Sequence, residues 1–175
     1  MRIAVVDSCF LINWSRFHQS ADILQVFSRI VVPEPVLEEL EDVRAKRILA
    51  AWIIKNVVII APRLLSLNGM TLRIVSLSEL LSHIPRIDPP EAYCLCLAKE
   101  RGYTVLTDNE ATKRVKEILE EFKEVDVMNS LDLLISLYGY DKTLLEKKIT
   151  RFMSETGIRF PRRRLEELGI ELKDP

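Results

Sequence analysis

The chain has 175 residues, of which 48% are hydrophobic and 29% are charged, and its formal net charge is −1 at pH 7. This length fits one full core, and this much apolar material excludes a disordered chain. No apolar run approaches the roughly 20 residues of a membrane span. The acid at position 7 rules out the apolar core of a signal peptide. We therefore expect a cytoplasmic protein without a membrane-spanning segment.

The three cysteines and two histidines do not form a recognisable zinc motif. Cys94 and Cys96 have C-x-C spacing, and no second Cys or His pair lies nearby to complete the four ligands of structural zinc. An odd number of cysteines without a secretion signal indicates reduced thiols, and we expect Cys9, Cys94 and Cys96 to fill the core.

The first half of the chain alternates short β-branched runs with helical patterns. Residues 3–6 predict a buried strand, and two helical stretches follow it, at 9–17 and 21–28. A second strand begins at residue 29 and is ended by prolines. From Val36 an apolar stripe of helical spacing continues to Ile53, and a third strand is expected at 57–62.

The second half continues the alternation and then becomes helical. Residues 63–87 are less regular, with a turn signal at Asn68-Gly69 and a helical pattern in LSELLSHI. Pro89 and Pro90 open a strong helix that Gly102 ends. The remaining predictions are strands at 104–107 and 125–128 and helices at 109–123, 130–137, 142–155 and 163–168. This order predicts an α/β fold, with a mostly parallel sheet covered by helices on both faces.

Acidic residues stand at the ends of these predicted strands or at the starts of the helices: Asp7, Glu39, Glu91 and Asp108. In an open α/β sheet, ligands bind in the crevice beyond the carboxyl ends of the strands. Carboxylates gathered there repel one another unless a divalent cation neutralises them. The pattern therefore suggests a metal site, and with it phosphoryl chemistry.

Each acid also has a structural interpretation. Asp7 would cap the first helix unless Ser8 does so, and Asn109 would cap a helix in place of Asp108. Acids in a first helical turn, such as Glu91, are favoured by the helix dipole. Glu38 and Glu39 differ by 100° around a helix, so only one of them would face the site; Glu39 is the better candidate.

Basic residues follow the fourth acid, with Lys113, Arg114 and Lys116 in one turn, and Arg162, Arg163 and Arg164 are consecutive near the C-terminus. Such patches hold phosphates even in a neutral protein, although a solvated helix face explains each patch equally well. The apolar residues of the helix at 130–137 are either core or a dimer surface. Core is favoured, because a helix with one apolar stripe normally packs inward.

The segments VVDSCFLI, PEPVLEEL, PPEAYCLCLA and VLTDNEATKR resemble, in this order, the acidic motifs of PIN-domain nucleases, including the VapC-type toxins of prokaryotes. The match covers roughly residues 1–128, and residues 129–175 are similar to the helical C-terminus of prokaryotic members. The resemblance implies a three-layer α/β/α sandwich. It also implies a nuclease core at 1–128 and a C-terminal helical extension at 129–175, packed on the same domain.

The resemblance further implies a metal-dependent endoribonuclease that hydrolyses single-stranded RNA. Mg²⁺ or Mn²⁺ would be held by Asp7, Glu91 and Asp108, with Glu39 as a further ligand or a water-orienting partner. Ser8, Thr107 and Asn109 would support the ligands by hydrogen bonds, and Lys113 and Arg114 would contact RNA phosphate. Two departures stand out: Asn109 replaces a second acid that is frequent in the family, and Glu91 replaces a frequent aspartate.

Toxin-type members usually dimerise and are held by an antitoxin, so the resemblance implies a homodimer and an antitoxin partner. The alternative is a catalytically silent PIN-like module that binds RNA or protein, which Asn109 favours. A small-molecule enzyme or a phosphoacceptor domain ranks third. The chain has no GxGxxG, P-loop or GxSxG motif, and it has a single acid after the first strand, where a phosphoacceptor needs adjacent acids.

Overall fold

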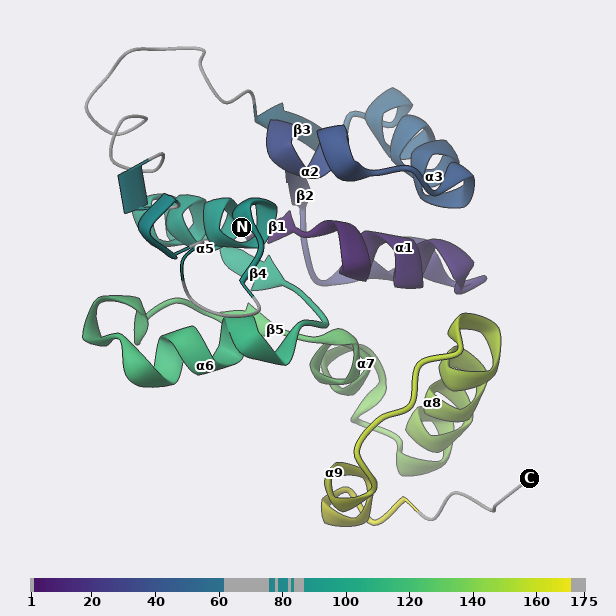
Figure 1. Cartoon of the computed structure of the whole chain (residues 1–175). Helices are drawn as coiled ribbons and strands as arrows, with labels where there is room; N and C mark the ends of the chain where they lie inside the picture. The colour runs from purple at the N-terminus through teal and green to yellow at the C-terminus, as the bar shows by residue number, and fades with distance from the viewer. Residues whose placement is uncertain (1, 62–75, 78, 82, 84–86, 171–175) are drawn as a thin grey trace.

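The computed structural model describes residues 2–61, 76–77, 79–81, 83 and 87–170 (Figure 1). Within them, a five-stranded sheet has the order β3-β2-β1-β4-β5, and all its neighbouring strands are parallel. The strands are β1 (Ile3–Val6), β2 (Arg29–Pro33), β3 (Val58–Ala61), β4 (Thr104–Leu106) and β5 (Val127–Met128). The short, apolar, β-branched runs form these strands because both faces of a parallel sheet are buried.

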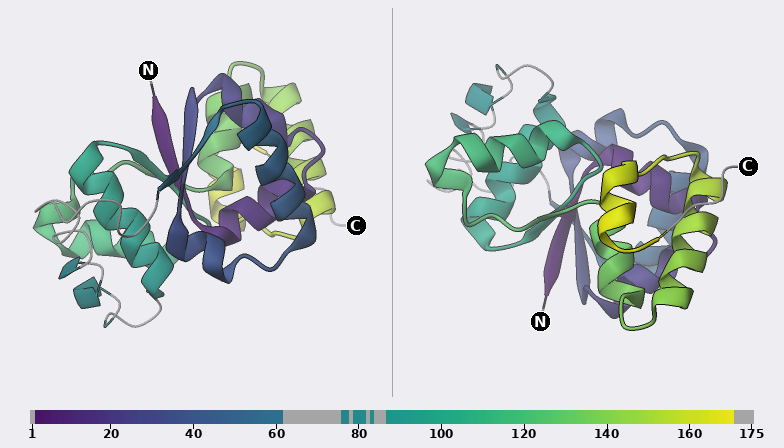
Figure 2. Two further views of the ribbon diagram at one scale, coloured as in Figure 1. Left: turned by 90° about the horizontal axis from the view of Figure 1, so that it is seen from above. Right: turned by 90° about the horizontal axis from the view of Figure 1, so that it is seen from below.

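Helices cover both faces of the sheet (Figure 2). α5 (Pro89–Arg101) and α6 (Glu110–Ile118) lie on one side of the strands. The other side carries α1 (Ser8–Arg16), α3 (Val43–Ile54), α7 (Ser130–Tyr138), α8 (Lys142–Thr156) and α9 (Arg162–Glu167). The fold is a three-layer α/β/α sandwich, as predicted.

The core is continuous from the sheet into the C-terminal helices. Trp14 of α1 is fully buried, and its ring packs against Phe10 and Phe17 of the N-terminal part and against Phe152 of α8. In α7 the side chains of Leu131, Leu134, Leu137 and Tyr138 are buried. The apolar stripe of this helix is therefore core, as the sequence favoured.

The apolar stripe from Val36 to Ile53 predicted one continuous helix, and this prediction is wrong because two helices form the segment. α2 (Glu34–Glu39) ends before Leu40, and α3 begins at Val43. Asp42 interrupts the helix because its side chain accepts the Ala45 N–H at 2.9 Å and caps α3. Val43 is consequently 61% exposed and does not belong to the apolar stripe.

Two other helix predictions were too long. The stretch expected at 21–28 is a short 3₁₀ helix, η1 (Ser20–Gln25), and the helix expected at 109–123 ends at Ile118. A second 3₁₀ helix, η2 (Glu120–Phe122), turns the buried Phe122 into the core. Asn68 and Gly69 lie outside the described residues, whereas residues 76–77 and 79–81 are helical and overlap the start of the pattern LSELLSHI at 77–84.

Candidate metal centre

The candidate site lies where the chain order of the sheet reverses. From β1 the chain proceeds through α1 to β2 on one side, while β4 pairs with β1 on the other side, with Val6 opposite Leu106. Asp7 directly follows β1, and its N–H donates to the Leu106 carbonyl at 3.1 Å. Thr107 and Asp108 directly follow β4. A crevice at the carboxyl ends of neighbouring strands at such a switch point is the usual ligand site of open α/β sheets.

Asp7 is buried and is also the N-cap of α1. Its Oδ1 accepts the Phe10 N–H at 2.8 Å, which satisfies one of the free amides of the first helical turn. The Cys9 Sγ lies 3.3 Å from both carboxylate oxygens, and the Thr107 side chain also hydrogen-bonds the carboxylate. Capping therefore falls to Asp7 and not to Ser8, while the carboxylate lies beyond the carboxyl end of β1.

The pKa of Asp7 is raised from 3.8 to about 7. Burial is the main cause, because removal of water disfavours the charged form, and the nearby charge of Asp108 adds to it. Hydrogen bonds from Thr107, Phe10 and Cys9 oppose this rise. Without a cation beside it, the charged form of Asp7 is therefore less stable in the fold than it is in water.

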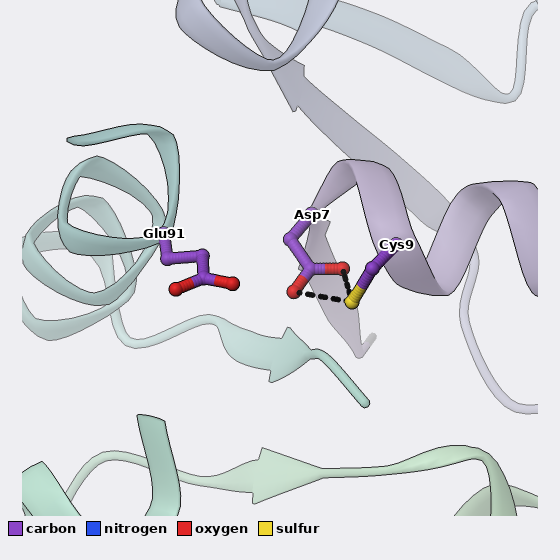
Figure 3. A group of neighbouring side chains, drawn as sticks. All are labelled: Asp7, Cys9 and Glu91. Atoms are coloured by element: carbon purple, nitrogen blue, oxygen red, sulfur yellow. Dashed lines mark hydrogen bonds between the residues drawn. The ribbon is translucent and has the colours of Figure 1, made fainter. Parts of the chain in front are cut away.

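Glu91 and Cys9 complete a compact group with Asp7. One ligand atom of each residue lies within 4.8 Å of the others, and Figure 3 shows Glu91 reaching from α5 toward Asp7 and Cys9. The sequence interpretation placed Cys9 in the core, but its side chain is only half-buried and lies beside the carboxylate of Asp7. Cys94 and Cys96 of α5 are buried, as expected.

Glu91 is held by two hydrogen bonds at the start of α5. Its Oε2 accepts the Asp88 N–H at 3.1 Å, and its Oε1 accepts the Asn109 Nδ2 donor at 2.7 Å. The pKa of Glu91 is raised, first by burial and then by the charges of Asp88 and Glu39. Asn109 also caps α6 by accepting the Ala111 N–H at 2.9 Å, so Asp108 is not the cap of that helix.

Glu39 lies at the end of α2, at the rim of the site. Its side chain is exposed, and its Oε1 accepts a hydrogen bond from the Ser8 hydroxyl. Its charge affects Glu91, although Glu39 is outside the compact group formed by Asp7, Cys9 and Glu91. Glu38 is exposed as well, and the Ser8 hydroxyl donates to Glu39.

Asp108 is also outside the compact group, and its carboxylate accepts three hydrogen bonds, each at 2.8 Å. Oδ1 accepts the Ser130 N–H, and Oδ2 accepts both the Ser130 hydroxyl and the Asn13 Nδ2 donor. The charge of Asp108 also contributes to the raised pKa of Asp7. The fourth predicted acid therefore lies beside the first.

The two predicted phosphate-binding residues lie on α6. The Lys113 Nζ is 2.7 Å from Asp132 Oδ2, so this cation is already paired. Asp132 is also 3.6 Å from Arg164 of α9. Arg114 is exposed.

The donor set fits a hard divalent cation. Carboxylate oxygens are the protein ligands that Mg²⁺ and Mn²⁺ prefer, and Mg²⁺ needs only a few of them because it keeps several waters. In the described residues, the hydrogen-bond partners of Asp7, Glu39, Glu91 and Asp108 are neutral donors, with no Lys or Arg paired to any of them. Burial is the main cause of the raised pKa values of Asp7 and Glu91, and a bound cation would stabilise the charged forms of both groups.

Fold and site together define an α/β protein with acidic side chains gathered beyond the carboxyl ends of its parallel strands, where they could hold a metal ion. A family model of the PIN domain matches residues 3–172. The chain therefore belongs to the PIN-domain family, whose members are in general metal-dependent nucleases. No curated protein matches it. In the part of the chain that the structure describes, no helix has the length and apolarity needed to cross a membrane.

Three residues of this region were missed from the sequence: Cys9, Asn13 and Ser130. Ser130 follows closely after the last strand, so the strand-end rule that located the acids would also have located it. Asn13 lies in the middle of α1, and no local sequence signal shows that its side chain contacts Asp108. Cys9 was read as core because an isolated free thiol usually is.

Proposed function

We propose that the protein is a metal-dependent endoribonuclease that hydrolyses phosphodiester bonds of single-stranded RNA. The observation that supports this most directly is the meeting of Asp7 and Glu91 within one compact group, with Asp108 beside Asp7. These three carboxylates are the proposed ligands of Mg²⁺ or Mn²⁺. Glu39 is the proposed fourth acid, as a further ligand or as the group that orients water.

The residues have distinct tasks in this proposal. When bound, a divalent cation supplies positive charge to the phosphate group and makes water more acidic. Asp7 is held by Phe10, Thr107 and Cys9, so its carboxylate is fixed before the cation and the substrate bind. Fixed ligands reduce the reorganisation needed during reaction. Ser8 fixes Glu39 in the same way, and Asn109 fixes Glu91.

The RNA backbone would approach the same edge of the sheet. Arg114 is exposed and is the better of the two predicted phosphate contacts, because Lys113 is paired with Asp132. Lys113 would have to exchange this carboxylate for a phosphate. An antitoxin partner, a homodimer and a cytoplasmic location belong to the same proposal, as the properties expected of a toxin in a toxin–antitoxin pair.

A second function has one observation in its favour. Asn109 is neutral at a position where an acid is frequent in the family, and its amide occupies Oε1 of Glu91. A site weakened in this way would bind RNA or a partner protein without cutting. This alternative predicts the same fold and no metal-dependent cleavage.

The test is cleavage of a mixed pool of single-stranded RNA by the purified chain with Mg²⁺, with Mn²⁺ or with EDTA. Asp7→Asn is the key variant, because asparagine still caps α1 while it removes the charge. Asp126→Asn is the matched control, since Asp126 pairs with Arg2 before β5, at the opposite end of the sheet.

We expect cleavage that requires the metal, vanishes in Asp7→Asn and persists in Asp126→Asn. Cleavage that Asp7→Asn retains in full would remove Asp7 from the site. Absence of cleavage with either metal, together with RNA binding that Asp7→Asn leaves intact, would support the silent module.

A further inference from the structure

Asp108 is held by a hydrogen-bond network that begins in the C-terminal helices. Ser130 is the first residue of α7 and is fully buried. Its N–H donates to Asp108 Oδ1 and its hydroxyl donates to Asp108 Oδ2, both at 2.8 Å. One residue thus binds both oxygens of the carboxylate and fixes the plane of the group.

The direction of the Ser130 hydroxyl is set by Trp14. The Trp14 Nε1 lies 3.0 Å from Ser130 Oγ, and both side chains are buried. An indole nitrogen is only a donor, so Oγ must accept this bond and its single hydrogen is directed to Asp108. Trp14 is in turn packed against Phe152 of α8, with ring centroids 5.4 Å apart.

Asn13 of α1 adds a third hydrogen bond to the carboxylate. Its Nδ2 donates to Oδ2 of Asp108 at 2.8 Å, in addition to the bond from Ser130. An ionised carboxylate has about four acceptor positions, and three are occupied here. The position that remains is on Oδ1, so any further partner of Asp108 would meet this oxygen.

We propose that Ser130 and Asn13 are positioning residues that orient Asp108 for metal binding, and that Trp14 acts through Ser130. The proposal rests on the proposed metal site. It assigns a role in that site to residues beyond the four acids, one of them in the C-terminal helices. Residues that hydrogen-bond to ligating carboxylates typically change metal affinity by about 10- to 100-fold when they are replaced.

The inference explains why a buried serine is tolerated at the start of α7. A buried hydroxyl costs stability unless its hydrogen bonds are satisfied, and here it both accepts from Trp14 and donates to Asp108. The N–H of Ser130 is one of the free amides of a helix start, where a negative charge is also favoured by the helix dipole. Ser130 therefore uses its N–H at the start of α7 and its buried hydroxyl to bind the Asp108 carboxylate, and both groups are hydrogen-bonded.

The experiment measures Mn²⁺ affinity by titration calorimetry, with folding checked by circular dichroism. The variants are Ser130→Ala, Asn13→Ala and Trp14→Phe, the last of which removes the indole donor and keeps an aromatic ring. Thr156→Val is the matched control, because Thr156 is a buried hydroxyl that donates to the Phe152 carbonyl within α8, away from the site.

We expect Ser130→Ala to weaken Mn²⁺ binding by about 10- to 100-fold and Asn13→Ala by about tenfold. Trp14→Phe should have a smaller effect, and Thr156→Val should lower thermal stability alone. In an Asp108→Asn background, Ser130→Ala should cause no further loss of affinity, since both changes remove the same ligand geometry. Asn13 is half-buried, so its variant keeps the test valid if Ser130→Ala does not fold.

Folded Ser130→Ala and Asn13→Ala proteins that bind Mn²⁺ like the parent chain would overturn the positioning role and leave the nuclease proposal standing. A chain that binds Mn²⁺, loses affinity in these variants and yet cuts no RNA would support the positioning role against the nuclease proposal. Absence of Mn²⁺ binding in the parent chain would overturn both.

Discussion

Two acids of the candidate site, Asp7 and Asp108, and two acids at the amino end of the sheet, Asp126 and Glu121, have different kinds of partners. At the amino end, Asp126 lies 2.6 Å from the Arg2 guanidinium and accepts the Thr104 hydroxyl at 2.9 Å, and Glu121 pairs with Lys99. At the carboxyl end, Asp7 and Asp108 accept only from amide, hydroxyl, side-chain amide and thiol groups among the described residues.

The difference separates acids that contribute to structure from acids that are available for function. A carboxylate beside a guanidinium is already neutralised and attracts no further cation. Carboxylates held only by neutral donors have no positive charge beside them, so a bound cation would stabilise their charged forms. The pKa of Asp7 is raised mainly because the carboxyl is buried without a cation beside it, and the charge of Asp108 adds to the rise.

The largest effect should come from pH acting on Asp7 in metal-free protein. Its pKa rises from 3.8 in the unfolded chain to about 7 in the fold, so the folded state binds the proton more tightly. The resulting stabilisation is complete below about pH 4 and is lost as pH rises to about 7. At 1.36 kcal/mol per pH unit, the change amounts to about 4 kcal/mol.

Urea unfolding in EDTA from pH 4 to pH 8 measures this effect in the parent chain and in Asp7→Asn. The variant should gain stability relative to the parent chain as pH rises through this window. Parallel curves of unfolding free energy against pH for the two proteins would show that ionisation of Asp7 does not destabilise the fold. The proposed difference between the acids at the two ends of the sheet would then lose its main support.

Mn²⁺ binding should restore part of the stability that the fold loses when Asp7 ionises, at pH 7 and above. A ligand that binds only the folded state adds about 2.7 kcal/mol of stability at a free concentration 100 times its Kd. We expect thermal unfolding to show this gain in the parent chain and in Asp126→Asn, and to show little of it in Asp7→Asn. An equal gain in all three proteins would place the bound metal elsewhere.

The sheet and the acids of this site were accessible from sequence for a simple reason. Buried parallel strands are short apolar runs, and the residue after each run lies at the same edge of the sheet. Asp7 and Asp108 follow such runs, so their proximity required only the strand order. Glu91 was found because two prolines fix the start of its helix.

The parts that could not be predicted depend on side-chain geometry between distant elements. The break between α2 and α3 comes from the capping of Ala45 by Asp42, a bond that competes with helix continuation and is hard to weigh within an acidic run. The contact of Asp108 with Asn13 joins residues 95 positions apart. No local pattern encodes such contacts.

A smaller effect should distinguish Glu39 from its neighbour Glu38. Glu39 accepts a hydrogen bond from Ser8 and its charge affects Glu91, so it belongs electrostatically to the carboxyl end. Glu39→Gln should slow metal-dependent cleavage by about tenfold, which is about 1.4 kcal/mol in activation free energy. Glu38→Gln, with the same loss of charge one residue away, should leave the rate near that of the parent chain. The reverse ranking would assign the second acid to Glu38.

The smallest effect should follow from breaking the ion pair at the amino end. Arg2 and Asp126 are both about half exposed, and surface pairs of this kind contribute about 0.2–1 kcal/mol. Asp126→Asn should therefore lower the unfolding free energy by less than about 1 kcal/mol and leave Mn²⁺ affinity unchanged. The loss should also diminish in high salt, because exposed charges are screened. A marked fall in Mn²⁺ affinity in this variant would mean that the two ends of the sheet are energetically coupled. Asp126 is paired with Arg2 and lies at the opposite end of the sheet, so its loss could affect the metal site only through such coupling.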